Sequence, residues 1–119
     1  MSENKHTYDT ICFMELTYEF DVSEKKEIEA KIKRKLKYYN LGKFDLERVE
    51  YLRIIKNDLF LEISKNTKSK YFKNSKGFAN MSDFNLEKLY KDYSEKYNKI
   101  EKGDLLTMIN YSIYLYYMR

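Results

Sequence analysis

Apolar side chains recur at helical spacing in two separate stretches of this 119-residue chain. Both stretches have cap residues at their N-terminal ends and a glycine just beyond their C-terminal ends. The stripe between residues 23 and 40 consists of Ile28, Ile32, Leu36 and Tyr39, and the stripe between residues 83 and 100 consists of Leu86, Leu89, Tyr90, Tyr93, Tyr97 and Ile100. Acid–lysine pairs four residues apart flank the second stripe. We therefore predict two amphipathic helices.

Two other stretches alternate between apolar and polar residues, as half-buried strands do. In residues 10–20 the alternating apolar residues are Cys12, Met14, Leu16, Tyr18 and Phe20. Residues 105–118 carry no charge, and Ile109, Tyr111 and Ile113 alternate there. We predict a strand in each stretch, although the spacing in residues 105–118 also suits a buried helix.

Residues 48–64 predict a β-hairpin that turns at Asn57 and Asp58. In that register Ile54 pairs with Leu61 on one face, and Arg53 pairs with Glu62 on the other. The alternative is a helix over residues 45–56, because apolar residues also recur there every three positions. In that case the hairpin moves to residues 59–72.

The predicted order of elements is strand, helix, strand, strand, helix, strand. It indicates an α+β fold, a small βαββαβ two-layer sandwich of ferredoxin-like order. The alternatives are a winged-helix-like order and a βαββαα order with a helical C-terminus. We expect a flexible N-terminus over residues 1–9 and one domain over residues 10–119, with a long basic loop at 65–82.

Several classes of protein are excluded by simple counts. A single cysteine, Cys12, cannot form an intrachain disulfide, and a single histidine, His6, cannot supply a histidine-based catalytic or metal site. No apolar run is long enough for a membrane span, and no signal-peptide pattern is present. We expect a cytoplasmic protein with no cofactor and no membrane partner.

Positive charge is concentrated in two windows. The net charge is +4, and residues 30–40 and 64–82 each carry five basic residues and no acid. These windows account for +10, so the rest of the chain sums to −6. Such a distribution suits a polyanionic partner if the two windows meet on one surface.

The sequence therefore predicts contact with DNA or RNA. Lysines neutralise phosphates and aromatic rings stack on bases, and the loop combines both residue types. The candidate residues in the loop are Lys65, Lys68, Lys70, Tyr71, Lys73 and Lys76, and those in the first helix are Lys31, Arg34 and Lys35. Around a helix, however, the basic residues of the first window spread over most of the circumference.

A protein partner or a homodimer is the alternative. On the predicted sheet, aromatic side chains face outward, and the tyrosine-rich C-terminal segment could extend that surface. The candidate interface residues are Phe13, Tyr51, Phe60, Tyr114 and Tyr116. A small inhibitor or immunity-type factor would use such a surface.

Enzyme chemistry has little support in the sequence. Cys12 lies on the predicted buried face of a strand and has no histidine nearby in the sequence. Asp58, Glu62 and Lys65 are the nearest candidates for a metal-dependent nuclease, but their spacing fits no strong pattern. We expect no catalytic residues and no metal site.

Overall fold

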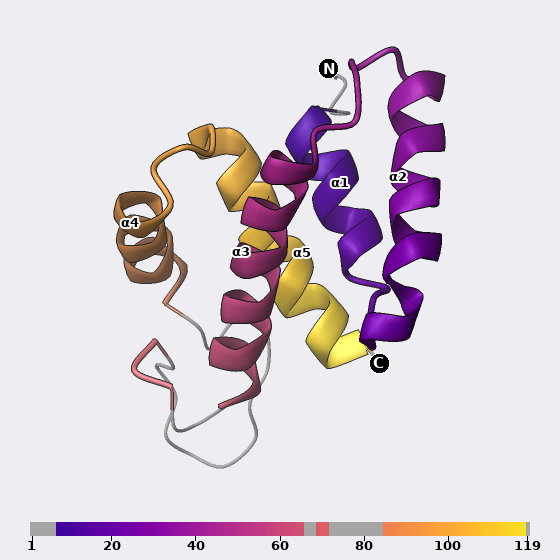
Figure 1. Ribbon diagram of the computed structural model, residues 1–119. Coiled ribbons are helices and arrows are strands. Elements are labelled where there is room, and N and C mark those ends of the chain that lie inside the picture. The colour runs from indigo at the N-terminus through magenta and orange to yellow at the C-terminus, as the bar shows by residue number, and fades with distance from the viewer. Residues whose placement is uncertain (1–6, 66–68, 72–84, 119) are drawn as a thin grey trace. The chain divides into compact units, whose positions relative to one another are not determined.

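The computed structural model describes residues 7–65, 69–71 and 85–118 (Figure 1). These residues form five α-helices and one short 3-10 helix, and no strand occurs among them. The elements are α1 (Tyr8–Leu16), η1 (Val22–Glu24), α2 (Lys25–Tyr38), α3 (Leu46–Ser64), α4 (Leu86–Lys96) and α5 (Lys102–Met118). The expected α+β sandwich is therefore wrong, and so are the alternatives that contain strands.

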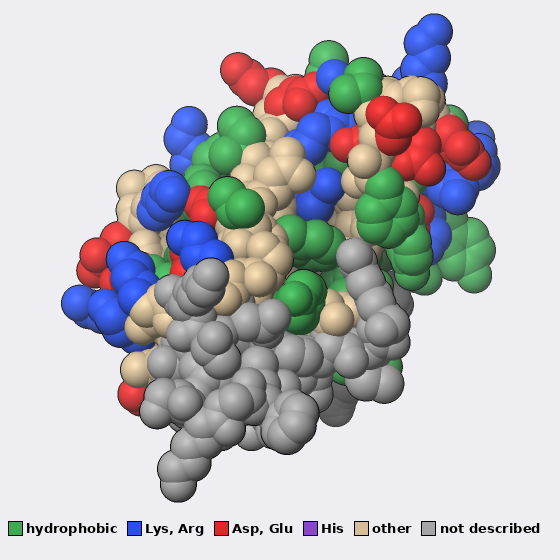
Figure 2. Space-filling model, turned by 90° about the horizontal axis from the view of Figure 1, so that it is seen from below, with side chains coloured by type: hydrophobic (Ala, Val, Ile, Leu, Met, Phe, Trp, Pro, Cys, Tyr) green, Lys and Arg blue, Asp and Glu red, His purple; other side chains and the backbone are tan. Residues whose placement is uncertain are grey.

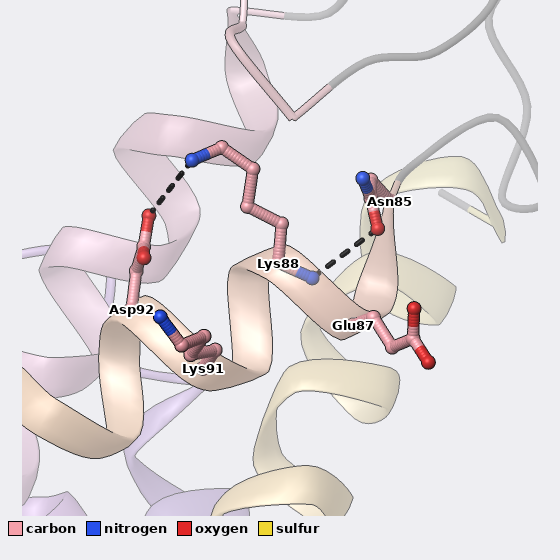
Figure 3. A pocket seen from close by; sticks show the side chains of 5 residues that line it. All are labelled: Asn85, Glu87, Lys88, Lys91 and Asp92. Atoms are coloured by element: carbon pink, nitrogen blue, oxygen red, sulfur yellow. Dashed lines mark hydrogen bonds and ion pairs between the residues drawn. The ribbon is translucent and has the colours of Figure 1, made fainter.

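Two predicted helices are confirmed. The stretch 23–40 contains α2, and the stretch 83–100 contains α4. The side chain of Asn85 caps α4 by accepting a hydrogen bond from the backbone N–H of Lys88 at 3.2 Å (Figure 3). In both helices the predicted stripe contains the residues that become buried.

The predicted strand over residues 10–20 is wrong because α1 is buried around most of its circumference. Only Tyr8 and Met14 of its nine residues are not buried, so no polar face interrupts the apolar pattern. Thr7 begins this helix with a capping box in which the side chains of Thr7 and Thr10 each accept from the other residue's backbone N–H. The helix α1 starts at Tyr8, within the stretch 1–9 for which we predicted a flexible N-terminus, and residues 1–6 lie outside the described residues.

The predicted hairpin over residues 48–64 is also wrong, since α3 runs without interruption through Asn57 and Asp58. The alternative helix at 45–56 anticipates only the first half of α3. The predicted strand over residues 105–118 is replaced by α5, whose buried residues follow helical spacing: Leu105, Met108, Ile109, Ser112 and Ile113.

The chain divides into two compact units, residues 1–56 and residues 57–119. The first contains α1, η1, α2 and the beginning of α3, and α1 and α2 pack side by side in it (Figure 1). The second contains the end of α3 together with α4 and α5, which also pack on each other.

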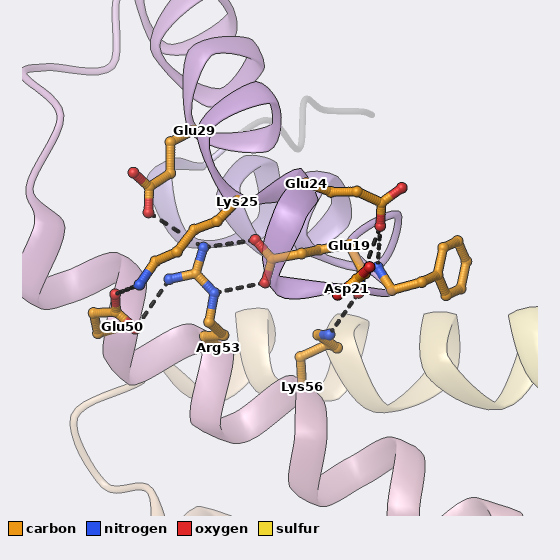
Figure 4. Close-up of polar contacts among 9 residues, drawn as sticks. Glu19, Asp21, Glu24, Lys25, Glu29, Glu50, Arg53 and Lys56 are labelled. Carbon is orange, nitrogen blue, oxygen red and sulfur yellow. Dashed lines mark hydrogen bonds and ion pairs between the residues drawn. The ribbon is translucent and has the colours of Figure 1, made fainter.

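Arg53 on α3 joins its helix to α2 and to the connection between α1 and η1 (Figure 4). Its guanidinium donates two hydrogen bonds to Glu19, at 2.7 and 2.8 Å, and lies 3.3 Å from Glu29 on α2 and 2.9 Å from Glu50 on α3. Hydrogen bonding to Glu19 raises the pKa of Arg53, against the effect of burial. The fork of donors on arginine suits this arrangement better than a single ammonium group does.

We expect Arg53→Lys to lower the free energy of unfolding by about 2 kcal/mol, because lysine cannot serve three carboxylates that are partly removed from water. Urea unfolding followed by circular dichroism measures the change. Arg34→Lys is the matched control, since Arg34 is exposed on α2, and it should change stability by less than about 0.5 kcal/mol. Equal effects of the two substitutions would contradict this role of Arg53.

Asp58 plays a similar part in the second unit. Its carboxylate accepts hydrogen bonds from Tyr93 at 2.8 Å, from Tyr97 at 2.5 Å and from the Lys96 ammonium at 2.7 Å. Burial raises the pKa of Asp58, but the hydrogen bonds from Lys96, Tyr97 and Tyr93 outweigh burial and hold the pKa below its ordinary value. This carboxylate therefore connects the end of α3 to α4.

We expect Asp58→Asn to destabilise the protein by about 2 kcal/mol near neutral pH, where the carboxylate is charged. Because the pKa of Asp58 is lower in the folded state, its contribution is complete above the unfolded value of about 3.9 and is lost as the pH falls through the folded value. Urea unfolding at several pH values should show the two proteins converging in acid. Glu95→Gln, at an exposed site on α4, is the control with little expected effect at neutral pH.

Candidate nucleic-acid interface on α2

The packing of α2 determines which of its basic side chains face solvent. Ile28, Ile32 and Leu36 are buried and fix the inner side of the helix, which lies against α1. At about 100° per residue, Lys26, Lys33 and Lys37 fall within about 40° of one another, about 120° around the helix from the centre of the buried stripe, and Arg34 lies about 60° beyond Lys37, nearly opposite that stripe. All four side chains belong to exposed residues.

The other basic residues of α2 contact carboxylates. The ammonium group of Lys35 lies 2.7 Å from Glu15, whose side chain is only 7% exposed, and Lys25 lies 3.1 Å from Glu50. Lys31 lies 3.8 Å from Glu27. The hydrogen bond to Glu15 raises the pKa of Lys35 against the effect of burial. These lysines support the fold, so the predicted binding roles of Lys31 and Lys35 receive no support from their positions.

No described carboxylate lies within ion-pairing distance of Lys26, Lys33, Arg34 or Lys37. These four residues define the basic face of α2. The Lys33 ammonium is 5.0 Å from the centre of the Phe44 ring, a cation–π contact that leaves its charge in place. Figure 2 shows acidic and basic side chains interspersed on one face of the molecule. The four cations of the basic face of α2, in contrast, have no acidic partner among the described residues.

The basic face follows the helix axis for about 17 Å, from Lys26 to Lys37. Over that length a DNA duplex presents about ten phosphate charges. Tyr38, at the C-terminal end of α2, lies about 40° around the helix from Arg34 and is 81% exposed. The arrangement can neutralise several phosphates at once and offers one aromatic ring beside them.

The loop residues predicted for nucleic-acid binding are only partly described. Lys68, Lys73 and Lys76 lie outside the described residues. The ammonium group of Lys65 lies 3.0 Å from the Glu62 carboxylate, which partly neutralises the positive charge of Lys65. Lys70 is exposed. Of the two predicted segments, residues 31–35 belong to the first unit and residues 65–76 to the second.

Tyr71 is not positioned to stack on a base. It is 3% exposed, and its hydroxyl donates a hydrogen bond to Asp92 at 2.8 Å. Its backbone carbonyl accepts from the N–H of Asn85 at 2.6 Å, so this residue fixes the chain to the start of α4. Burial, together with the hydrogen bond to Asp92, raises the pKa of Tyr71 above its ordinary range. Its burial and its hydrogen bonds indicate a structural role for this tyrosine.

The predicted partner interface was placed on a sheet, and the described residues contain no strand. Phe13 is fully buried in α1, and Tyr51 on α3 is half-buried with the Arg48 guanidinium 5.5 Å from its ring centre. Phe60 and Tyr116 are half-buried, and Tyr114 on α5 is 48% exposed. Of these five residues, Tyr114 alone is exposed.

Two hollows in the second unit do not select a ligand. One has a volume of about 510 Å³ and is lined by two acids and two lysines with Asn85, shown in Figure 3. The other, of about 320 Å³, is lined by Asp58, Glu62, Lys70, Tyr71, Asp92, Tyr93, Glu95 and Lys96. In the first, acids and lysines are equal in number, and the Lys88 ammonium lies 3.6 Å from Asp92. In the second, four acids stand against two lysines, but Asp58, Glu62 and Asp92 already accept hydrogen bonds from described side chains. No group of acids, His and Cys in the described part of the chain is placed to hold a metal ion.

Cys12 is completely buried in α1. Burial and the nearby charge of Asp9 raise the pKa of its thiol to about 12, so the reactive thiolate is scarce at neutral pH. The catalytic candidates Asp58 and Glu62 both accept hydrogen bonds from other side chains. Asp58 accepts from Tyr93 at 2.8 Å, and Glu62 accepts from Ser69 at 2.6 Å. Asp58 and Glu62 line the same hollow, but no group of described acids is placed to hold the metal ion that such a nuclease needs.

We expect Cys12 to react with Ellman's reagent at least about 100-fold more slowly in the folded protein than in urea, because the reaction needs both thiolate and access. Absorbance at neutral pH measures the rate. A small peptide containing cysteine, labelled under both conditions, controls for the effect of urea on the reagent. Similar rates for folded and unfolded protein would show that the thiol is accessible.

Comparisons with protein-family models, curated proteins and solved structures found no match to this chain. No helix among the described residues combines the length and apolar character needed to cross a membrane. Of the four residues of the basic face, we predicted only Arg34 as a binding residue and missed Lys26, Lys33 and Lys37. The spacing of Lys26 by seven residues from Lys33 and by eleven from Lys37 was the available signal, because both intervals return to the same side of a helix.

Proposed function

We propose that this protein binds nucleic acid through the basic face of α2, without catalysing a reaction. The observation that carries the proposal is the position of four cations with no described acidic partner on one side of a helix whose other lysines contact acids. Unpaired cations gain most from phosphate contact, because no intramolecular ion pair has to be broken first.

The basic face suits the phosphate backbone better than the base edges. Three of its four charged side chains are lysines, which act as point charges, whereas Arg34 can also form paired hydrogen bonds with one phosphate. Phosphate contacts position a protein on its ligand and carry no direct sequence information. We therefore expect affinity with little sequence preference.

Affinity for a short DNA duplex should fall by on the order of 100-fold between 50 and 200 mM salt if all four cations contact phosphates. Lys33→Gln with Lys37→Gln should lower the slope of log affinity against log salt by about 2. Fluorescence anisotropy with a labelled duplex and a labelled RNA strand measures both quantities.

Lys88→Gln with Lys91→Gln is the matched control. It removes the same charge from exposed positions on α4 and should leave the slope nearly unchanged. No binding at low salt, or equal slopes for the two double variants, would refute the proposal. Circular dichroism of each variant would show that the helices are retained.

A further inference from the structure

The connection between α1 and α2 presents apolar side chains to solvent. Tyr18 is 53% exposed, Phe20 is 70% exposed and Val22 is 84% exposed, all within five residues. Large apolar groups concentrated in this way on a surface mark an interaction site more often than isolated ones do. Residues 18–24 form the segment that we call the apolar turn.

Hydrogen bonds hold the backbone of the apolar turn in one conformation. The Glu24 carboxylate accepts from the backbone N–H of Phe20 at 2.7 Å and of Asp21 at 3.0 Å, and the Glu24 N–H donates to the Asp21 carbonyl at 2.9 Å. The ammonium group of Lys56 on α3 donates to the Glu19 carbonyl at 3.2 Å (Figure 4). Much of the conformational entropy that a flexible loop would lose on binding is therefore already lost in the free protein.

The charge of the apolar turn indicates the chemistry of the partner. Residues 18–24 contain three acids and no basic residue. Arg53 contacts Glu19, but Asp21 and Glu24 make hydrogen bonds with neutral groups only. Lys25 follows directly and does not neutralise them, because its ammonium lies 3.1 Å from Glu50. A protein with an apolar pocket bordered by Lys or Arg would complement this surface.

We infer that the apolar turn docks into an apolar pocket with a basic rim on another protein, with Phe20 and Val22 as the inserted side chains. Aromatic residues at the centre of a patch that excludes water carry most of the affinity in protein interfaces. The acids at Asp21 and Glu24 speed association and set the orientation through the rim. A small inhibitor or immunity-type factor would act through such a contact.

To identify the partner, the full chain is made with a photo-crosslinking amino acid at position 20. It is then mixed with nuclease-treated extract of the native cells and irradiated. The same amino acid at position 38 is the control, because Tyr38 is also aromatic and is 81% exposed. We expect position 20 to form one discrete crosslink that position 38 does not form. Crosslinks of equal yield at both positions, or none at position 20, overturn the proposal.

The partner identified by crosslinking is then purified, without a crosslink, and its binding to this protein is measured by calorimetry. Phe20→Ala with Val22→Ala should weaken binding at least about 30-fold, and Asp21→Asn should weaken it about 3-fold and reduce its salt dependence. Tyr38→Ala should have no effect on this affinity. Unchanged affinity of the Phe20/Val22 variant, a contact site without basic residues, or crosslinking of the pure protein to its own copies would each refute the inference.

Discussion

The contact between Arg53 and three carboxylates is the constraint on which the first unit depends. Glu19 follows α1, Glu29 lies on α2, and Glu50 lies beside Arg53 on α3, so one guanidinium ties its own helix to two segments that are distant in sequence. Without that cation the three carboxylates would repel one another at close range. The path of the chain from α1 to α2 follows from this contact.

Only the elements with one polar side could be predicted from the sequence. In α2 and α4 the apolar residues form a single stripe, and the helical period is visible. In α1 even Asp9 and Glu15 are buried, each beside a basic side chain, and the periodic signal disappears. In α3 the pair Asn57–Asp58 suggested a turn, but Asp58 is instead an acceptor for donors on α4.

The sequence predicted a basic segment at the candidate site, but it did not predict which basic side chains of that segment are exposed and without an acidic partner among the described residues. Counting charges identified residues 30–40, but which lysines remain available depends on acids elsewhere in the chain, such as Glu15 beside Lys35. The same limit applies to Tyr71, since its acceptor, Asp92, is 21 residues away. Local pattern shows that charges and rings are present, whereas tertiary pairing decides which of them can meet a ligand.

On α2 the residues that pack and the residues that face solvent are different sets. Ile28, Ile32 and Leu36 are enclosed, whereas Lys33 and Lys37 contact no described acid. Exchanges of Lys33 or Lys37 for glutamine should therefore change the folding free energy little. Single replacements on α2 can therefore raise or lower the affinity of this protein for a polyanion. The surface that would bind the ligand can evolve separately from the residues that maintain the helix.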